Sequence, residues 1–246
     1  MFHRAWHGFS TPLMCRTAVA GPWMSDYTTP HRDAAALITV DAQRDYAEHD
    51  SPVRSAGAAQ VLDPLARLVN GVRGGAVPIY HLIRLYWSDG SNVDLCRRQA
   101  VEEGMRVLMP GSRGAELVST VAPPESARLD PHLLIDGEPQ NLAPDEAAFY
   151  KPRWGAFYGT SLDESLRARG ITTLVISGCN FATSGRATVL EASERDYRIV
   201  LVPDATAGLT SEAQQELCRV GVHLMPVETC LTWLAGASAP PAFPAA

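Results

Sequence analysis

Short apolar runs alternate along the chain with longer segments in which apolar residues recur every three or four positions. Five runs are typical of strands buried on both faces of a parallel sheet: residues 33–43, 77–87, 171–178, 197–205 and 222–225. Four longer segments have the spacing of helices with one buried face: residues 58–75, 159–170, 184–196 and 210–220. Strands that alternate with helices predict an α/β fold around an open, parallel sheet.

Three segments do not follow this alternation. Residues 88–132 are polar and contain several Gly, Ser and Pro residues, and a loop of this length is usually a lid or an insertion. Residues 1–32 carry basic side chains where a signal peptide would be apolar, and we expect them to form a disordered extension. Residues 235–246 are rich in Pro and Ala and predict a disordered tail. The folded domain is therefore expected over residues 33–234.

Composition narrows the class of protein and its partners. The chain has 246 residues, 46% of them hydrophobic and 20% charged, which fits one globular domain. The net charge of −6 and the absence of a basic run argue against a nucleic-acid partner. No apolar run reaches the roughly 20 residues that cross a bilayer, so no membrane partner is expected. The five scattered cysteines fit a reducing cytoplasm, where we expect the protein to lie.

Polar residues follow several of the predicted strands. In open parallel sheets, ligands bind beyond the carboxyl ends of the strands. Asp41 ends the first run, residues 84–87 end the second, and the turn "GCNFATSG" follows the third. Lys151 is expected on a loop before a helix. The turn contains two possible nucleophiles, Cys179 and Ser184.

Three stretches in this order resemble the isochorismatase-like (cysteine) hydrolase family. They are "ITVDAQRDY", "YKPRWGAFYGTSLDESLRARGI" and "VISGCNFATSGRATVLEASERDYRIVLVPDATAG", and the resemblance covers roughly residues 35–227. The family includes nicotinamidases, N-carbamoylsarcosine amidohydrolases, ureidoacrylate hydrolases and isochorismatases. The resemblance implies a three-layer αβα domain with a mostly parallel six-stranded sheet, and a homo-oligomer.

The resemblance also implies catalytic roles. Asp41 matches the general base and Lys151 its electrostatic partner. The family's nucleophilic Cys lies six residues after the Gly that ends the strand, and counting from Gly178 this position is Ser184. The backbone N–H groups of Asn180 and Ser184 would form the oxyanion hole. Cys179 would lie beside a peptide bond that is often cis in this family.

Other residues near these strand ends are predicted to bind substrate. Binding pockets are mostly apolar with a few directed polar groups. On this basis we expect substrate contacts from Gln43, Tyr46, Arg84, Trp87, Trp154, Phe157 and Cys179. The Asp-x-His pattern that binds metal in the family's nicotinamidases is missing from "HLIRLYWSDG", so no metal and no other cofactor are expected.

The serine at position 184 leaves several hypotheses open. An alcohol is far harder to deprotonate than a thiol of pKa ~8.5. The first hypothesis is a hydrolase that cleaves an amide, lactam or ureido C–N bond of a small molecule. The second is a non-covalent lyase, cyclase, isomerase or vinyl-ether hydrolase of a biosynthetic pathway, with Asp41 as acid or base. The third is a catalytically dead ligand-binding protein, and an engineered exchange of Cys for Ser is a further explanation.

Overall fold

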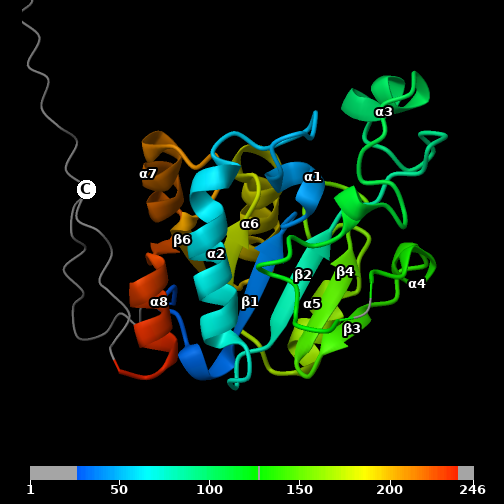
Figure 1. Cartoon of the computed structure of the whole chain (residues 1–246). Coiled ribbons are helices and arrows are strands. Elements are labelled where there is room, and N and C mark those ends of the chain that lie inside the picture. Colours follow the sequence, from blue (N-terminus) through cyan, green and yellow to red (C-terminus); the bar gives the residue numbers. More distant parts are fainter. Residues whose placement is uncertain (1–26, 127, 238–246) are drawn as a thin grey trace, which may run out of the picture.

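The computed structural model describes residues 27–126 and 128–237 (Figure 1). Its centre is a seven-stranded sheet of order β3-β4-β2-β1-β5-β6-β7. The strands are β1 (Ala35–Val40), β2 (Ile79–Ile83), β3 (Gln140–Ala143), β4 (Glu146–Tyr150), β5 (Thr173–Gly178), β6 (Arg198–Thr206) and β7 (His223–Leu224). All neighbouring pairs are parallel except β3 with β4. The predicted α/β fold is confirmed, with one strand more than the six expected.

The hairpin of β3 and β4 is the part of the sheet that the apolar pattern did not indicate. β3 is an edge strand without a buried residue, and β4 begins with a buried carboxylate, Glu146. Neither has the continuous apolar run of a strand buried on both faces. Lys151 directly follows β4 and begins the loop before the next helix, as predicted, whereas the strand that precedes it was not predicted.

Helices cover both faces of the sheet. In Figure 1, α2 (Ala58–Val72) and α8 (Val227–Leu234) lie on one face, with α5 (Leu162–Ala168), α6 (Arg186–Ser193) and α7 (Ser211–Arg219) on the other. Alternate residues of β1 serve the two cores, because Leu37 packs with α2 and α8 while Ile38 packs with α5 and α6. Burial of each such side chain contributes about 1.5–3 kcal/mol. The layers therefore hold the strand ends in a fixed arrangement.

Shorter elements gather at the carboxyl edge of the sheet. They are α1 (Arg44–Ala47), α3 (Leu95–Glu102), η2 (Arg113–Ala115) and the π-helical turn η3 (Phe181–Gly185), while α4 (Pro131–Ile135) lies beside β4. Figure 1 shows α3 set apart from the layers, above the carboxyl ends of the strands. The long polar segment thus contributes two short helices and covers this edge. No helix in the described part of the chain is long and apolar enough to span a bilayer.

The domain begins earlier than the sequence indicated. Pro30 is buried, the backbone N–H of His31 donates to Thr173 Oγ1 at 2.9 Å, and η1 (Arg32–Ala34) follows directly. Pro30 and the backbone of His31 therefore already contact the domain, whereas Tyr27 is exposed. At the other end, Ala235 caps α8. The rest of the predicted extension and tail, residues 1–26 and 238–246, lies outside the described residues.

Candidate active site at the carboxyl edge of the sheet

Three side chains from distant parts of the chain meet at the carboxyl edge. Asp41 follows β1, Lys151 follows β4, and Ser184 lies in η3 after β5. Lys151 Nζ donates to Asp41 Oδ2 at 3.1 Å and to Ser184 Oγ at 3.3 Å. It also lies 2.9 Å from Asp41 Oδ1. Its third donor reaches the carbonyl oxygen of Arg153 at 3.4 Å. The ammonium group therefore connects the carboxylate to the alcohol.

The three groups are removed from bulk water. Lys151, Asp41 and Ser184 are 0%, 1% and 4% exposed. Burial lowers the pKa of Lys151 to about 8, against the opposing effect of the Asp41 charge. Asp41 Oδ1 has no hydrogen-bond partner among the described groups, although the ammonium lies close to it. A buried oxygen with spare acceptor capacity is available for proton transfer.

Backbone geometry places Asp41 against the turn that carries Ser184. Asp41 has φ 53°, in the left-handed region, and its N–H donates to the carbonyl of Leu82 at 2.8 Å. The N–H of Cys179 donates to the carbonyl of Val40, also at 2.8 Å. Gly178, with φ 121°, lies so near Val40 that a Cβ would collide with its carbonyl oxygen. A glycine is therefore required where β5 passes β1 into the turn.

The turn itself holds Ser184 just before α6. The peptide bond between Cys179 and Asn180 is cis, as the resemblance implied. Asn180 Oδ1 accepts from the N–H of Thr183 at 3.3 Å, and the N–H of Phe181 donates to the carbonyl of Ala207 at 2.7 Å. These contacts fix the predicted oxyanion residues, Asn180 and Ser184, on one short turn. The oxyanion role itself stays a prediction.

The second possible nucleophile of the turn is in a poor environment for reaction. Cys179 is buried among apolar side chains that include Tyr46 and Ala207. Burial, and after it the charge of Asp41, raises the pKa of Cys179 to about 12. The thiol therefore stays protonated near neutral pH, and a protonated thiol is a weak nucleophile.

Gln43 uses its side-chain amide to hold the backbone beside the site. Its amide nitrogen donates to the carbonyl oxygens of Arg84 at 2.8 Å and Ala115 at 2.6 Å, and its Oε1 accepts from the N–H of Arg84 at 2.8 Å. The amide is thus occupied by the backbone. We assign Gln43 the positioning of Arg84 instead of the substrate contact expected from sequence.

A polar cluster that includes two predicted substrate-binding residues adjoins Lys151. Arg84 Nη2 donates to Asp94 Oδ2 at 2.7 Å, and the hydroxyl of Tyr86 donates to the same oxygen at 2.8 Å. Arg97 Nη1 donates to the hydroxyl groups of Tyr86 at 3.0 Å and Tyr46 at 3.4 Å. The sequence analysis placed Tyr86 at a strand end without giving it a role, and it missed Asp94 and Arg97 because no motif or spacing singled them out within a long polar segment.

An open hollow of about 520 Å³ lies beside the buried groups. Its lining includes Asp94, whose carboxylate binds Arg84, and Arg153, whose carbonyl oxygen binds Lys151. Trp154 and Tyr158, both exposed, supply aromatic surface. Asp41, Lys151 and Ser184 do not line the hollow themselves, and it adjoins them through Asp94 and Arg153.

Two predicted substrate contacts lie elsewhere. Phe157 is buried in the core, with its ring 5.7 Å from that of Tyr197. Trp87 is partly exposed and lies against the ring of His132 at 6.2 Å. Neither residue lines the hollow. An aromatic residue near a strand end can belong to the core or the site, and the sequence did not distinguish the two for Phe157.

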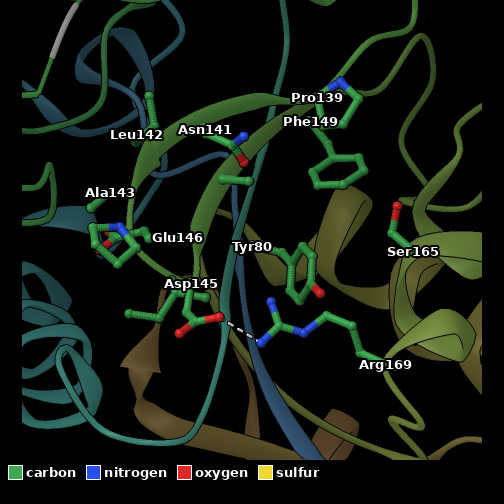
Figure 2. Close-up of a pocket in the computed structure, with 13 residues that line it drawn as sticks. Tyr80, Pro139, Asn141, Leu142, Ala143, Asp145, Glu146, Phe149, Ser165 and Arg169 are labelled. Carbon is green, nitrogen blue, oxygen red and sulfur yellow. Dashed lines mark hydrogen bonds and ion pairs between the residues drawn. The ribbon is translucent and has the colours of Figure 1, made fainter.

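A second hollow, of about 750 Å³, opens at the opposite edge of the sheet (Figure 2). Tyr80 and Glu146, at the amino ends of β2 and β4, border this hollow together with Arg169. Arg169 pairs with Asp145 at 2.7 Å. This is the amino edge of the strands, away from Lys151. The described residues hold no group of three or more His, Cys, Asp or Glu side chains suited to a metal ion.

The chain resembles known proteins over this whole region. The isochorismatase domain model matches residues 134–227. A probable inactive nicotinamidase of Arabidopsis thaliana is 29% identical over 72% of this chain and 82% of its own length. Ureidoacrylate amidohydrolase RutB of Methylorubrum extorquens is 26% identical over 94% of this chain and 91% of its own. The chain is therefore similar to an isochorismatase domain over residues 134–227 and to amidohydrolase-like proteins over most of its length.

Solved structures share the fold of this domain. An isochorismatase family protein from Desulfovibrio vulgaris superposes with a TM-score of 0.70 at 27% identity, over 82% of this chain and 98% of that one. The N-carbamoylsarcosine amidase of Thermoplasma acidophilum shares the fold at 22% identity, with a TM-score of 0.61. The family match contains Lys151 and Ser184, whereas Asp41 lies before it in the sequence. The assembly of this chain stays a prediction.

Proposed function

We propose that the chain hydrolyses a C–N bond of a small amide, lactam or ureide, with Ser184 as the attacking group. The observation that carries this proposal is the position of Lys151 Nζ, within 3.3 Å of Ser184 Oγ and 3.1 Å of Asp41 Oδ2. The name of the RutB relative, a ureidoacrylate amidohydrolase, supports hydrolysis of an amide or ureide bond. The other relative is named a probable inactive nicotinamidase, so activity has to be measured directly.

The reaction would proceed in two stages. Lys151 gives a proton to the carboxylate of Asp41 and takes the proton of Ser184 in its place, while Ser184 Oγ attacks the carbonyl carbon. The C–N bond breaks, and the nitrogen leaves with the proton on Asp41. Water then attacks the acyl group on Ser184 and gives one proton to Asp41. The acid leaves as Ser184 regains a proton, which restores the starting state.

Charge stabilisation would come from the same small region. The carbonyl oxygen gains negative charge during attack, and the N–H groups of Asn180 and Ser184 are the proposed donors to it. The ammonium of Lys151 offsets the charge on the attacking oxygen. Because the site is shielded from water, each of these interactions is stronger than it would be at the surface.

The test is a search for an acyl group on Ser184. Ammonia release is followed with a panel of primary amides and ureido compounds, and intact mass is measured during turnover. We expect Ser184→Ala to lose activity by at least about 10³-fold, as expected for removal of a nucleophile. Ser184→Cys should keep or raise it, because a thiol ionises more readily than an alcohol.

Full activity in Ser184→Ala would contradict covalent hydrolysis. It would support instead the hypothesis of non-covalent acid–base chemistry on Asp41. Enol ethers belong in the same panel, since their cleavage needs a proton from an acid but no acyl intermediate.

A further inference from the structure

The guanidinium of Arg84 is buried with donors that have no acceptor. Its side chain is 1% exposed, and only Nη2 is used, by Asp94 Oδ2 at 2.7 Å and more weakly by the hydroxyl of Tyr86 at 3.4 Å. Nε and Nη1 find no hydrogen-bond partner among the described residues. The Tyr86 ring lies 5.1 Å from the guanidinium carbon and offers a cation–π contact, but it satisfies no N–H group. Buried donors of this kind are costly unless another molecule supplies the acceptor.

Strand pairing places Arg84 beside Lys151. Ile83 of β2 pairs with Tyr150 of β4, and the N–H of Lys151 donates to the carbonyl of Ile83 at 2.9 Å. Arg84 and Lys151 are therefore level, and alternation directs both side chains to the face that α5 and α6 cover. The charge of Arg84 is among the influences on the pKa of Lys151, after burial and Asp41. The free donors thus belong to the same site as the proposed nucleophile.

The local charge balance favours an anion. Lys151 pairs with Asp41, and Arg84 pairs with Asp94. Arg97, with its Nη1 3.8 Å from Asp94, adds a third cation to these two carboxylates. One positive charge is therefore left over in a largely buried cluster. A carboxylate from a bound molecule would neutralise it and supply oxygens that accept from Arg84.

We propose that Arg84 binds a carboxylate of the substrate through Nε and Nη1, so that the molecules hydrolysed are acids that also carry the amide or ureide. The statement that these acids are hydrolysed rests on the proposed function, whereas the binding of a carboxylate by Arg84 does not. The hollow lined by Asp94 and Arg153 gives such a molecule access, because its wall is shared by the groups that hold Arg84 and Lys151.

The test compares acids with their uncharged counterparts. The probes are succinamate and 3-ureidopropionate, each beside its methyl ester, which keeps the amide or ureide and removes the charge. Binding is measured by calorimetry in a Ser184→Ala background, and ammonia release in the chain with Ser184. Wild-type Arg84 should favour each acid over its ester. Arg84→Gln should weaken binding of the acids about 10- to 100-fold and of the esters less than about threefold.

Two further variants keep the result interpretable. Arg84→Gln leaves Asp94 without its cation, so Arg84→Gln combined with Asp94→Asn removes both charges and guards against misfolding. Arg97→Gln is the matched control: it deletes a nearby positive charge but leaves Nε and Nη1 of Arg84 in place. Arg97→Gln should weaken binding of the acids less than Arg84→Gln does. The difference separates a direct contact with Arg84 from the effect of positive charge nearby.

The outcomes separate this inference from the proposed function. Preferential binding of acids that depends on Arg84 supports the role of Arg84 even where no ammonia is released, and in that case hydrolysis alone fails. Equal affinity for acid and ester overturns the inference, even where both are hydrolysed. Equal losses for acid and ester in the double variant overturn it as well.

Discussion

Two buried charge clusters of this domain differ in how completely their polar atoms are used. At the carboxyl edge, Asp41 Oδ1 and two nitrogens of Arg84 lack hydrogen-bond partners within the described structure. The other cluster lies between α2 and the sheet, around Glu146. There, Arg73 donates twice to the carboxylate at 2.7 and 2.8 Å, and His81 Nε2 lies 2.8 Å from the same group.

The second cluster is closed as well as buried. His81 Nδ1 lies 2.7 Å from the hydroxyl of Thr39, and Arg73 Nη2 also donates to the carbonyl of Val121 at 2.6 Å. Burial lowers the pKa of His81, so the ring is neutral near neutral pH. We infer that the Glu146 cluster holds β4 against the end of α2. The cluster of Lys151 and Arg84 instead keeps hydrogen-bond donors and an acceptor unused, and these are available to a ligand. The two clusters are similarly buried and differ in whether their donors and acceptors are used.

The largest expected effect on activity comes from removing the ammonium group of Lys151 from the cluster at the carboxyl edge. Lys151→Met should lower kcat/KM by more than about 10³-fold, because Asp41 and Ser184 lose the group that connects them. The exchange also leaves Asp41 buried without its cation, which costs about 3–5 kcal/mol of unfolding free energy. Ammonia release and chemical unfolding measure the two effects. Activity within tenfold of wild type would contradict the role of Lys151.

In the Glu146 cluster we expect a substitution to lower stability and to leave activity nearly unchanged. Glu146→Gln removes the anion that Arg73 holds and should lower the unfolding free energy by about 3–5 kcal/mol. The activity of the folded fraction should change less than about threefold, because Glu146 lies at the amino end of β4. Glu228→Gln is the control, since Glu228 and its partner Arg67 are both exposed and such pairs contribute about 0–1 kcal/mol. If Glu146→Gln lost activity but kept its stability, the structural role inferred for the Glu146 cluster would be wrong.

Acid unfolding sharpens the same contrast. Although burial opposes the shift, hydrogen bonds from Arg73 and His81 lower the pKa of Glu146 to about 2 from an ordinary value near 4.5. The unfolded chain therefore binds the proton first, and this stabilisation is present above pH 4.5 and lost as the pH falls toward 2. The wild-type advantage over Glu146→Gln should shrink across that window in urea titrations.

A smaller effect is expected from the alkaline titration of Lys151. Its pKa of about 8 means that the ammonium loses its proton just above neutral pH. If the charged form supports Asp41 and Ser184, kcat/KM should fall about tenfold per unit above pH 8. A rate that rises through pH 8 would show instead that neutral Lys151 accepts the proton of Ser184. The profile of Arg97→Gln serves as the control for general electrostatic change.

The sequence predicted the layers better than the site. Continuous apolar runs indicated the central strands because burial on both faces leaves a strong pattern. The edge hairpin around Glu146 has no such pattern, so the sequence indicated the loop of Lys151 but not the strand that ends just before it. The strand ends indicated that Asp41 and the turn with Ser184 lie at one edge, and the resemblance added their roles and that of Lys151. Asp94 and the unused donors of Arg84 depend on long-range packing, which no local spacing records.

The smallest expected effect separates the two nucleophile candidates of the turn. Cys179→Ala removes a buried thiol whose pKa burial raises to about 12, so activity should stay within about threefold of wild type. The lost packing should cost about 1 kcal/mol of unfolding free energy, similar to the cost of Cys230→Ala, which removes another buried thiol far from the site. Ammonia release and urea unfolding of both variants give the comparison. Loss of activity in Cys179→Ala alone, with Ser184→Ala active, would transfer the covalent role to the thiol and exclude the alcohol.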